Sequence, residues 1–544
     1  MKRVLLALAA LLAFTGTARA STIDVAVLDS LQYRGFLYFW NEANPSNGLI
    51  KDRDTPGSVS SIASTGFGLS AICIAVEHGW VTRDAARARV LTTLQTFWNG
   101  PQGSGSSGFI GYKGLYYHWL DMNTARRTWD SELSTIDTAL LFAGILHARE
   151  FFAANDPSDN QIRALADSIT WRADWNWARN NASGLTMGWH PVSGFLGNRW
   201  TGYNEAMIMY IIALGSPTHP VPPSDWNWWC SFYNWSNPAG NDVGFFVTFP
   251  PLFGHQYSHC WIDFRHIRDQ YMTFRGLTYF ENSRRATLAQ LAHARLQDRL
   301  WHFTGNAVYN LGYSDSLWGF TASDDPVQGY AAHGAPNGFD NGTITPTAAI
   351  SSLPFAPDSV WPCIRNMWTH RNAVYEGRVY PLYGTYGFTD AFNPVKYPWF
   401  ASATLGIDQG PIVMMIENWR NDMVWARFMG NADIQRGLQL AGFTLLPTGV
   451  DDAPLAGARD VFFGAHPNPA FGATALRFRL ARPAHVRMDV YDTLGRRVAT
   501  LADGARGAGE HELALDRRAL PAGVYLCRLA VDGQPYLRKA TLLP

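Results

Sequence analysis

The sequence predicts a large helical domain, arranged as a toroid of paired inner and outer helices, followed by a small β-sandwich. Apolar residues recur at helical spacing in ten segments between Asp24 and Leu445, without convincing β-type alternation between them. The stretch from Pro447 to Pro454 interrupts this pattern, and short segments of alternating apolar and polar residues follow it. The predicted units are a helical domain at 21–446, a linker at 447–458 and a β-sandwich at 459–544.

The helical segments are numerous and several carry start signals. Thr82 is a candidate N-cap, and Pro157 with Ser158 and Asp159 opens a further helix. About ten to twelve helices are too many for a simple bundle, whereas a toroid accommodates them and gathers loops at one end, where a cleft can form. The segments are 26–43, 60–79, 83–98, 132–154, 158–179, 203–214, 276–298, 358–371, 409–418 and 431–443.

The C-terminal region has the alternation of half-buried strands. Ala475 to Leu480 and Val486 to Tyr491 alternate, and the second segment leads into a turn at Asp492 to Arg496. Strands are also expected at 509–513 and 523–529. About seven short strands in a region of this length indicate a small β-sandwich.

The N-terminus has the three parts of a secretory signal peptide, predicted at residues 1–20. Lys2 and Arg3 are basic, residues 4–14 are apolar, and Ala18 and Ala20 supply small residues near a cleavage site. No later run approaches the ~20 apolar residues of a membrane span. We therefore expect a secreted, soluble protein without a membrane span, located in the periplasm, at the cell surface or outside the cell.

Composition limits the class of ligand. The chain has 44 basic and 44 acidic side chains, so its formal net charge is zero, which argues against nucleic acid as a partner and favours a neutral ligand. The five cysteines are odd in number and widely spaced, so no disulfide framework is expected, although one bridge is compatible with the count. No cofactor is expected, and we expect a monomer.

Tryptophan is abundant, with 22 residues, and many lie in loops rich in glycine or proline. Most tryptophans in a chain of this size fill the core. Indole faces nevertheless also stack on the apolar faces of pyranose rings, while polar neighbours bind the hydroxyls. The aromatic candidates for substrate binding are Trp129, Trp189, Tyr203, Trp261 and Trp318.

Two aspartates beside Trp129 are candidates for catalysis. Asp130 and Asp137 are seven residues apart, so they share one face if the segment is helical throughout. The alternative is local: Ser134 acts as an N-cap with Asp137 as its capping-box partner, and Asp130 merely favours a helix N-terminus. The sequence leaves both interpretations open.

Glu205 is the strongest candidate for a general acid. It is the only acidic residue between Asp174 and Asp225, and it stands at the start of an apolar helix. A helix N-terminus lowers a carboxyl pKa, whereas burial beside Tyr203 raises it. A general acid that works near neutral pH requires the effect of burial to dominate.

Two further segments carry candidate ligands. Glu417 follows an apolar run and is a candidate for sugar binding, although an ion pair with Arg420 at i+3 is the plainer interpretation. His255 and His259 have the i, i+4 spacing of metal ligands, but no H-E-x-x-H arrangement is present, so no metal is predicted. Hydrogen bonding to substrate is expected instead from His259, Asp263 and Arg265.

Five separate motifs occur in order along the helical domain: Ser131 to Leu141, Tyr203 to Glu205, Gln256 to Asp263, Trp318 to Asp324, and Gln409 to Asn418. Together they resemble the bacterial glucoamylase-like (glycoamylase) family, which is similar to the endo-β-1,2-glucanases of glycoside hydrolase family 144. The resemblance runs from about Tyr33 to Phe443. It implies an (α/α)6 toroid and a β-1,2-linked glucan as substrate, and it places Glu205 at the general acid. It also implies a departure, since relatives that act on β-1,2-glucan align a glutamate with Asp137 and an aspartate with Ser134.

The C-terminal domain has a separate resemblance. The segments His466 to Pro469, Val490 to Arg496 and Pro521 to Tyr525 resemble the immunoglobulin-like domain of flagellar hook-capping proteins and the sorting domains of the type IX secretion route. The first relative implies a spacer or adhesion module. The second implies an export signal that contacts secretion machinery.

These observations predict a secreted glycoside hydrolase. Glu205 would protonate the departing oxygen, Asp137 would act on the anomeric side through water, and Asp130 would orient water or substrate. One alternative is a glycan-binding protein with little or no catalysis. A second alternative is a polysaccharide lyase with Tyr257 or His259 as base and Arg265 as charge neutraliser, which would require a uronate substrate.

Overall fold

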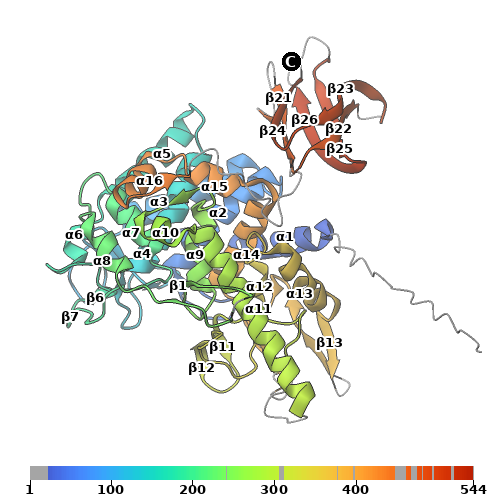
Figure 1. Ribbon diagram of the computed structural model, residues 1–544. Coiled ribbons are helices and arrows are strands. Elements are labelled where there is room, and N and C mark those ends of the chain that lie inside the picture. Colours follow the sequence, from blue (N-terminus) through green and yellow to red (C-terminus); the bar gives the residue numbers. More distant parts are fainter. Residues whose placement is uncertain are drawn as a thin grey trace, which may run out of the picture.

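The computed structural model describes residues 23–240, 242–304, 312–375, 378–395, 399–446, 461–466, 474–480, 482–492, 495–515 and 520–542. The predicted signal peptide at 1–20 and the predicted linker at 447–458 lie outside the described residues. The remaining chain forms a helical domain and a C-terminal region rich in strands (Figure 1).

Six helices are almost entirely buried and form the centre of the helical domain. Their sequences are apolar on nearly every side, which is the composition of a helix surrounded by other elements. In α7 every residue is buried, and in α2 only the last two are not. The six are α2 (Ile62–Glu77), α4 (Thr135–Phe151), α7 (Met207–Gly215), α9 (Phe253–Trp261), α12 (Pro346–Ile350) and α14 (Gly406–Asn421).

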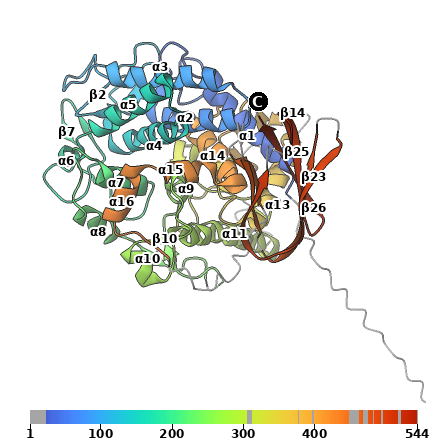
Figure 2. The same ribbon diagram turned by 90° about the horizontal axis from the view of Figure 1, so that it is seen from above.

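Six partly exposed helices pack against this buried set. Helix α1 contacts α14 and α2, α3 contacts α2 and α5, α5 contacts α4, α16 contacts α7, α11 contacts α9, and α13 contacts α12. Figure 2 shows α2 and α4 beside one another, with α3 and α5 outside them. These helices are α1 (Val25–Asn41), α3 (Arg83–Asn99), α5 (Pro157–Trp171), α11 (Tyr279–Thr304), α13 (Pro357–Thr369) and α16 (Ala432–Leu440).

The prediction of a helical domain is confirmed, with three local differences. The segment expected at 132–154 becomes helical only at Thr135, and the segment expected at 158–179 is divided into α5 and α6. Short helices were not predicted because one or two turns carry too little periodicity to be recognised. Apart from α9 and α12, the short helices are α6 (Trp175–Ala178), α8 (Ser224–Cys230), α10 (Gln270–Arg275) and α15 (Met423–Phe428).

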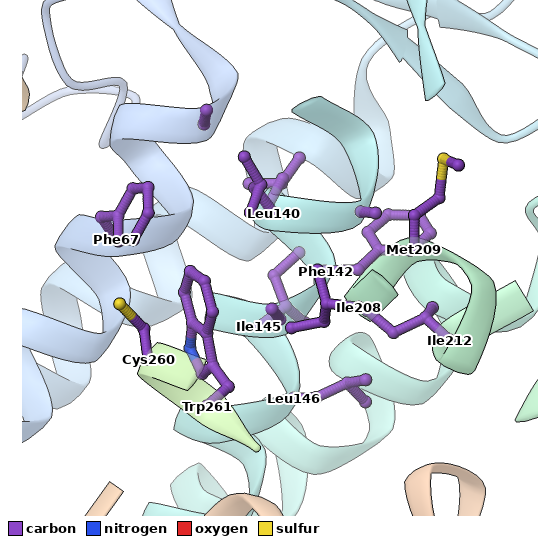
Figure 3. Close-up of a cluster of buried hydrophobic side chains, with 14 of the residues drawn as sticks. Phe67, Leu140, Phe142, Ile145, Leu146, Ile208, Met209, Ile212, Cys260 and Trp261 are labelled. Atoms are coloured by element: carbon purple, nitrogen blue, oxygen red, sulfur yellow. The ribbon is translucent and has the colours of Figure 1, made fainter. Parts of the chain in front are cut away.

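Helices α2 and α4 approach closely through two glycines. A Cβ atom on Gly144 would lie 1.9 Å from the carbonyl oxygen of Gly66, and one on Gly66 would lie 2.2 Å from that of Leu140. Only glycine permits this contact between backbones. Apolar side chains from α2, α4, α7 and α9 interlock beside it, as Figure 3 shows for Phe67, Leu140, Ile208 and Trp261.

Short strands lie in the loops before the buried helices, contrary to the expectation of no β structure in this domain. Strand β1 (Ser60–Ser61) pairs with β4 (Trp119–Leu120) and continues directly into α2. Strand β5 (Leu133–Ser134) lies in a five-stranded sheet and continues directly into α4. The other strands of this sheet are β2 (Gly111–Tyr112), β3 (Leu115–Tyr117), β6 (Gly188–His190) and β7 (Gly194–Phe195).

The remaining strands of the helical domain form two-stranded pairs. They were missed because strands of two to four residues show no measurable alternation. They are β8 (Trp235–Ser236), β9 (Phe246–Val247), β10 (Ile267–Arg268), β11 (Ala322–Asp325), β12 (Gly329–Ala332), β13 (Asn372–Tyr375), β14 (Arg378–Pro381), β15 (Tyr383–Gly384), β16 (Gly387–Phe388), β17 (Phe392–Asn393), β18 (Trp399–Phe400) and β19 (Thr444–Leu445).

The C-terminal region contains two antiparallel sheets with a shared apolar core, and the strands predicted there are confirmed. One sheet has the order β20-β21-β24 and the other β23-β22-β25-β26. Their inward residues, among them Phe478, Val490 and Leu529, form one cluster. The strands are β20 (Val461–His466), β21 (Thr474–Leu480), β22 (Ala484–Tyr491), β23 (Arg497–Arg506), β24 (Gly509–Leu515), β25 (Gly523–Val531) and β26 (Gln534–Leu542).

Two further predictions concern disulfide bonds and membrane spans. All five cysteines are buried thiols without a disulfide partner. Among the described residues, none of the helices combines the length and the hydrophobicity that crossing a lipid bilayer requires.

Candidate active site

Glu205 lies in the turn that leads into α7. The turn is held from both sides: Asn204 Oδ1 accepts a hydrogen bond from the Ala206 N–H at 3.0 Å, and Ser258 Oγ of α9 donates to the Glu205 carbonyl at 3.1 Å. The Glu205 carboxyl oxygen Oε2 is buried and has no hydrogen-bond partner in the described chain. The backbone is therefore fixed, while the carboxyl group is left available.

Burial, with a smaller contribution from the negative charge of Asp137, raises the pKa of Glu205 to about 7. The two effects act in the same direction because each disfavours the ionised carboxylate. The carboxyl group therefore retains its proton close to neutral pH, as a general acid must.

Asp137 lies in the first turn of α4, and the N-cap prediction is confirmed. Ser134 Oγ accepts a hydrogen bond from the Asp137 N–H at 3.1 Å and donates one to Asp137 Oδ2 at 2.5 Å. The side chain of Asp137 is 14% exposed. Ser134 thus fixes one oxygen of this carboxylate.

The expectation that Asp130 and Asp137 share a helix face is wrong. Leu133 and Ser134 form strand β5, which pairs with β3 and β6, so the chain enters the helix only after Asp130. The Asp130 side chain is 87% exposed and pairs with Arg127 at 2.6 Å. Strand pairing overrides the helical periodicity of this segment.

His118 was not singled out from the sequence, yet it joins the acidic residues of the site. Its Nδ1 lies 2.9 Å from Glu132 Oε1, and its Nε2 lies 3.6 Å from Asp137 Oδ2. Burial opposes the imidazolium, but the charges of Asp137 and Glu132 outweigh it and raise the pKa of His118 to about 9. Only the pairing of β3 with β5 brings these residues together, and local sequence gives no sign of it.

The same three residues are the one cluster in the described chain whose geometry suits a metal ion. Their ligand atoms lie within 4.8 Å of one another. Burial raises the pKa of Glu132, but the hydrogen bond from His118 outweighs it and lowers this pKa. A protonated His118 between two carboxylates accounts for the cluster as an ion-pair triad.

A buried carboxyl pair was also missed. Asp408, in the first turn of α14, lies within hydrogen-bonding reach of Asp390, whose other oxygen accepts from the Asp324 N–H at 2.6 Å. Burial raises the pKa of Asp390 to about 7, and burial with repulsion from Asp390 raises that of Asp408. The pair therefore shares a proton. The charges of Asp408 and Glu205 both reach the Tyr257 hydroxyl.

Tyr203 and His259 lie inside the domain, joined by a third residue. Ser283 Oγ is 3.4 Å from the Tyr203 hydroxyl and 3.0 Å from His259 Nε2, and all three side chains are buried. Burial lowers the pKa of His259 to about 3, so its imidazole is neutral. His255, also buried, has no partner for either ring nitrogen in the described chain.

Trp261 and Trp318 lie in the core. The Trp261 ring stacks on Phe67 with centroids 4.8 Å apart, and its Nε1 donates to Ser70 Oγ at 2.9 Å. Trp318 is fully buried in a second apolar cluster. Protein covers the whole surface of both indoles, so in this structure neither is accessible to a sugar.

Asp263 and Arg265 follow the C-terminal end of α9, whereas Glu205 contacts Ser258 within the helix. The two residues pair with each other at 2.6 Å, and Arg265 also pairs with Asp422 at 3.0 Å and lies over the Trp425 ring. The positive charge of Arg265 is thus neutralised within the protein. The structure does not bring Tyr257, His259 and Arg265 together in the way a lyase requires.

Glu417 is fully buried near the C-terminal end of α14. The sequence favoured an ion pair between Glu417 and Arg420 over sugar binding. That prediction is wrong, because Arg420 pairs with Asp29 at 2.6 Å. Burial works to raise the pKa of Glu417, but hydrogen bonds and the charge of His78 outweigh it and lower this pKa. The partners of Glu417 are Gln32 Nε2 at 2.7 Å, His78 Nε2 at 2.7 Å and Asn421 Nδ2 at 2.8 Å.

Trp129 and Trp189 are the two predicted tryptophans with accessible surface next to the acids. Trp189 is half-buried in β6, one residue beyond the partner of Ser134, and packs against Tyr112 with ring centroids 5.2 Å apart. Trp129 is 67% exposed. The structure therefore brings together Glu205, Asp137 and His118, and it links Trp129 to His118 through Trp119. Trp189 pairs with Leu133 and so lies on the opposite face of the sheet from Ser134.

Comparison with known proteins identifies the family of the helical domain and the kind of domain that follows it. Residues 197–432 match the family model described as "Glycoamylase: Putative glucoamylase", and residues 465–542 match the secretion system C-terminal sorting domain. The curated exo-β-1,2-glucooligosaccharide sophorohydrolase of Parabacteroides distasonis is 28% identical over 448 residues, which cover 76% of this chain and 58% of that protein. The chain thus spans less than two thirds of this relative.

Solved structures cover the helical domain more completely. A Bacteroides uniformis protein titled a "putative glucoamylase" is 32% identical, with a TM-score of 0.66 over 77% of this chain and 98% of that one. The endo-β-1,2-glucanase of Chitinophaga pinensis, in complex with sophorotriose and glucose, is 27% identical, with a TM-score of 0.67 over 77% and 98% of the two chains. By these matches, this chain belongs to the glycoamylase family and carries a C-terminal secretion sorting domain.

Proposed function

We propose that this protein is a secreted glycoside hydrolase that cleaves β-1,2-linked glucan, with Glu205 as the general acid. One observation carries the proposal: Glu205 has a buried carboxyl oxygen, Oε2, without a partner, and its pKa is raised to about 7 by burial and by the nearby charge of Asp137. The substrate class comes from the relatives, which are named as hydrolases of β-1,2-glucan or its oligosaccharides.

An (α/α)6 toroid is the arrangement we propose for the helices. Six buried helices each contact at least one of six partly exposed helices, which supports alternating inner and outer rings. Asp137, Glu205 and Asp408 all lie at or just before the first turn of a buried helix, which supports a shared end for the loops and the site. For the C-terminal region, seven strands in two sheets support an immunoglobulin-like sandwich.

In the proposed reaction, Glu205 transfers its proton to the glycosidic oxygen as the bond from that oxygen to the anomeric carbon breaks. A water molecule adds to the anomeric carbon and gives its proton to a carboxylate. Asp137 is our first candidate for that carboxylate because its charge reaches Glu205. The pair of Asp390 and Asp408 is the alternative, because the charges of Asp408 and Glu205 both act on Tyr257.

Export is proposed from the two ends of the chain. The signal-peptide features of residues 1–20 support passage across the inner membrane. The C-terminal sorting domain supports recognition by secretion machinery and a location at the cell surface or outside the cell. We propose that the exported enzyme acts as a monomer.

The test is turnover of linear β-1,2-glucan by the purified protein, with β-1,3-glucan, β-1,4-glucan and starch as comparison substrates. We expect Glu205→Gln to lower kcat by about 10²- to 10⁴-fold, the usual contribution of a general acid, while oligosaccharide binding is retained. Glu281→Gln, which alters a surface ion pair with Arg285 in α11, is the matched control. Full activity of the Glu205 variant would refute its role, and binding without any product would favour a glycan-binding protein.

A further inference from the structure

Trp129 has two features that a structural tryptophan rarely combines. Its side chain is 67% exposed, and its backbone is left-handed with φ of 53°. Exposure of a large apolar ring and a left-handed backbone at a bulky residue both cost free energy. Backbone strain of this kind concentrates at functional sites, where the surrounding structure imposes it.

Arg127 imposes the conformation of this loop. Its side chain is only 5% exposed and donates three hydrogen bonds across the loop: Nε to the Ser131 carbonyl at 2.6 Å, Nη2 to Asp130 Oδ1 at 2.6 Å and Nη1 to the Ser106 carbonyl at 2.9 Å. The guanidinium also lies over the Tyr117 ring, 5.0 Å from its centroid. The hydrogen bonds from Arg127 to Asp130 and Ser131 thus fix the chain on the C-terminal side of Trp129.

The exposed indole lies close to the proposed reacting groups. The His118 ring stacks on Trp119 with centroids 3.9 Å apart, and Trp119 meets Trp129 edge to face at 5.8 Å. Because Trp119 contacts both rings, the rings of Trp129 and His118 lie within about 10 Å of each other. His118 in turn faces Asp137 at 3.6 Å. A disaccharide unit covers this distance.

We propose that Trp129 is the stacking platform of a sugar subsite one or two glucose units away from the cleaved bond. Asp130 and Arg127 are positioning residues that hold the platform, so Asp130 has no part in the chemical step. This inference rests on the proposed function. The ligand is a neutral glucan because the platform is one flat apolar face flanked by polar groups, Asp130 and His190, that suit hydroxyls.

Binding measurements test this subsite independently of the chemical step. In a Glu205→Gln background, isothermal titration calorimetry with β-1,2-gluco-oligosaccharides of increasing length measures affinity without turnover. We expect Trp129→Ala to weaken binding of the longer oligosaccharides by about tenfold, as for an interface hot spot, and to leave the shortest unchanged. Trp129→Phe keeps a ring and should retain most of the affinity. Phe274→Ala, which removes another exposed ring at 81% exposure in α10, is the control.

Kinetics tests the role assigned to Asp130. In the otherwise unchanged enzyme, Asp130→Asn should raise KM for long substrates severalfold and leave kcat unchanged. The variant loses binding energy that the ground state and the transition state share, and the chemical step is unaffected. An equal loss of kcat would overturn the positioning role. Equal affinity of the Trp129→Ala and parent proteins at every length would overturn the subsite. Failure of the parent to bind any β-1,2-glucan would refute the proposed function as well.

Discussion

Glu205 and Glu417 are two glutamates of the helical domain with buried carboxyl oxygens, yet their surroundings are opposite. Glu205 precedes α7, has a carboxyl oxygen without a partner, and has a pKa raised to about 7. Glu417 lies near the end of α14, accepts hydrogen bonds from three side chains, and has a lowered pKa. The number of donors around each carboxyl group sets this difference.

The comparison shows how to separate function from structure among buried acids. A buried carboxylate that the protein fully satisfies stabilises the fold, and its charge is compensated within the chain. A buried carboxyl group that the protein leaves unsatisfied costs stability unless a substrate completes it. Glu205 and the pair of Asp390 and Asp408 belong to the second kind, whereas Glu417 belongs to the first.

The largest effect in this comparison is expected from His118, the charged residue that supports Asp137. Replacement of His118 by Asn removes the cation between Glu132 and Asp137, and activity should fall by about tenfold or more because a general base depends on its orientation and charge. The pKa of Glu132, which His118 now lowers, should rise. Carbon NMR of labelled Glu132 measures that change, and kcat/KM on linear β-1,2-glucan measures the loss of activity.

The control for this experiment is His293→Asn, which alters a histidine–aspartate pair at a distance from the site. His293 pairs with Asp340 at 2.8 Å and belongs to α11. Unchanged kcat and kcat/KM in the His118 variant would show that the triad is not part of the active site.

Glu417 provides the second test, on stability. Glu417→Gln keeps the shape of the side chain but removes the charge that three donors satisfy, so the free energy of unfolding should fall by about 1–3 kcal/mol. Because the folded pKa is lowered, the contribution of Glu417 is present above the unfolded pKa and is lost as pH falls. Denaturant unfolding at pH 7 and pH 4 should show a larger loss at pH 7, because at pH 4 the contribution of the ionised Glu417 has already begun to decline.

Denaturant unfolding of the Glu205 variant tests the other side of the comparison between Glu205 and Glu417. Glu205→Gln replaces an unsatisfied carboxyl group, so its stability should equal or exceed that of the parent above pH 7. If kcat falls in the Glu417 variant as it does in the Glu205 variant, the division between structural and functional acids is wrong.

The sequence predicted the helices well and the site only in part. Apolar periodicity located all ten long segments because burial of one helix face leaves a regular pattern. Glu205 was recognised because it is an isolated acid at the start of an apolar helix. His118 and Asp390 were missed because the strand and loop contacts that bring them to the site join residues far apart in the chain.

The tryptophans show a different limit of sequence reasoning. Trp261, buried against Phe67, and Trp129, exposed beside Asp130, occur in similar aromatic and polar segments. Composition records that an indole is present but not whether other helices cover it, because that depends on the packing of the whole domain. Asp130 failed for a related reason, since the pairing of β5 interrupts the expected helix.

The smallest effect is expected in the alkaline limb of the pH profile. Glu205 must carry its proton to act as an acid, so kcat/KM should fall as pH rises through about 7. Asp137→Asn removes a negative charge that helps to raise this pKa, so the residual activity should fall at a lower pH, with a shift of about one unit or less because burial is the larger cause. Pre-steady-state rates across pH 5 to 9, or carbon NMR of labelled Glu205, would measure the shift. A limb that moves to higher pH in this variant would mean that Asp137 does not act on Glu205 through its charge.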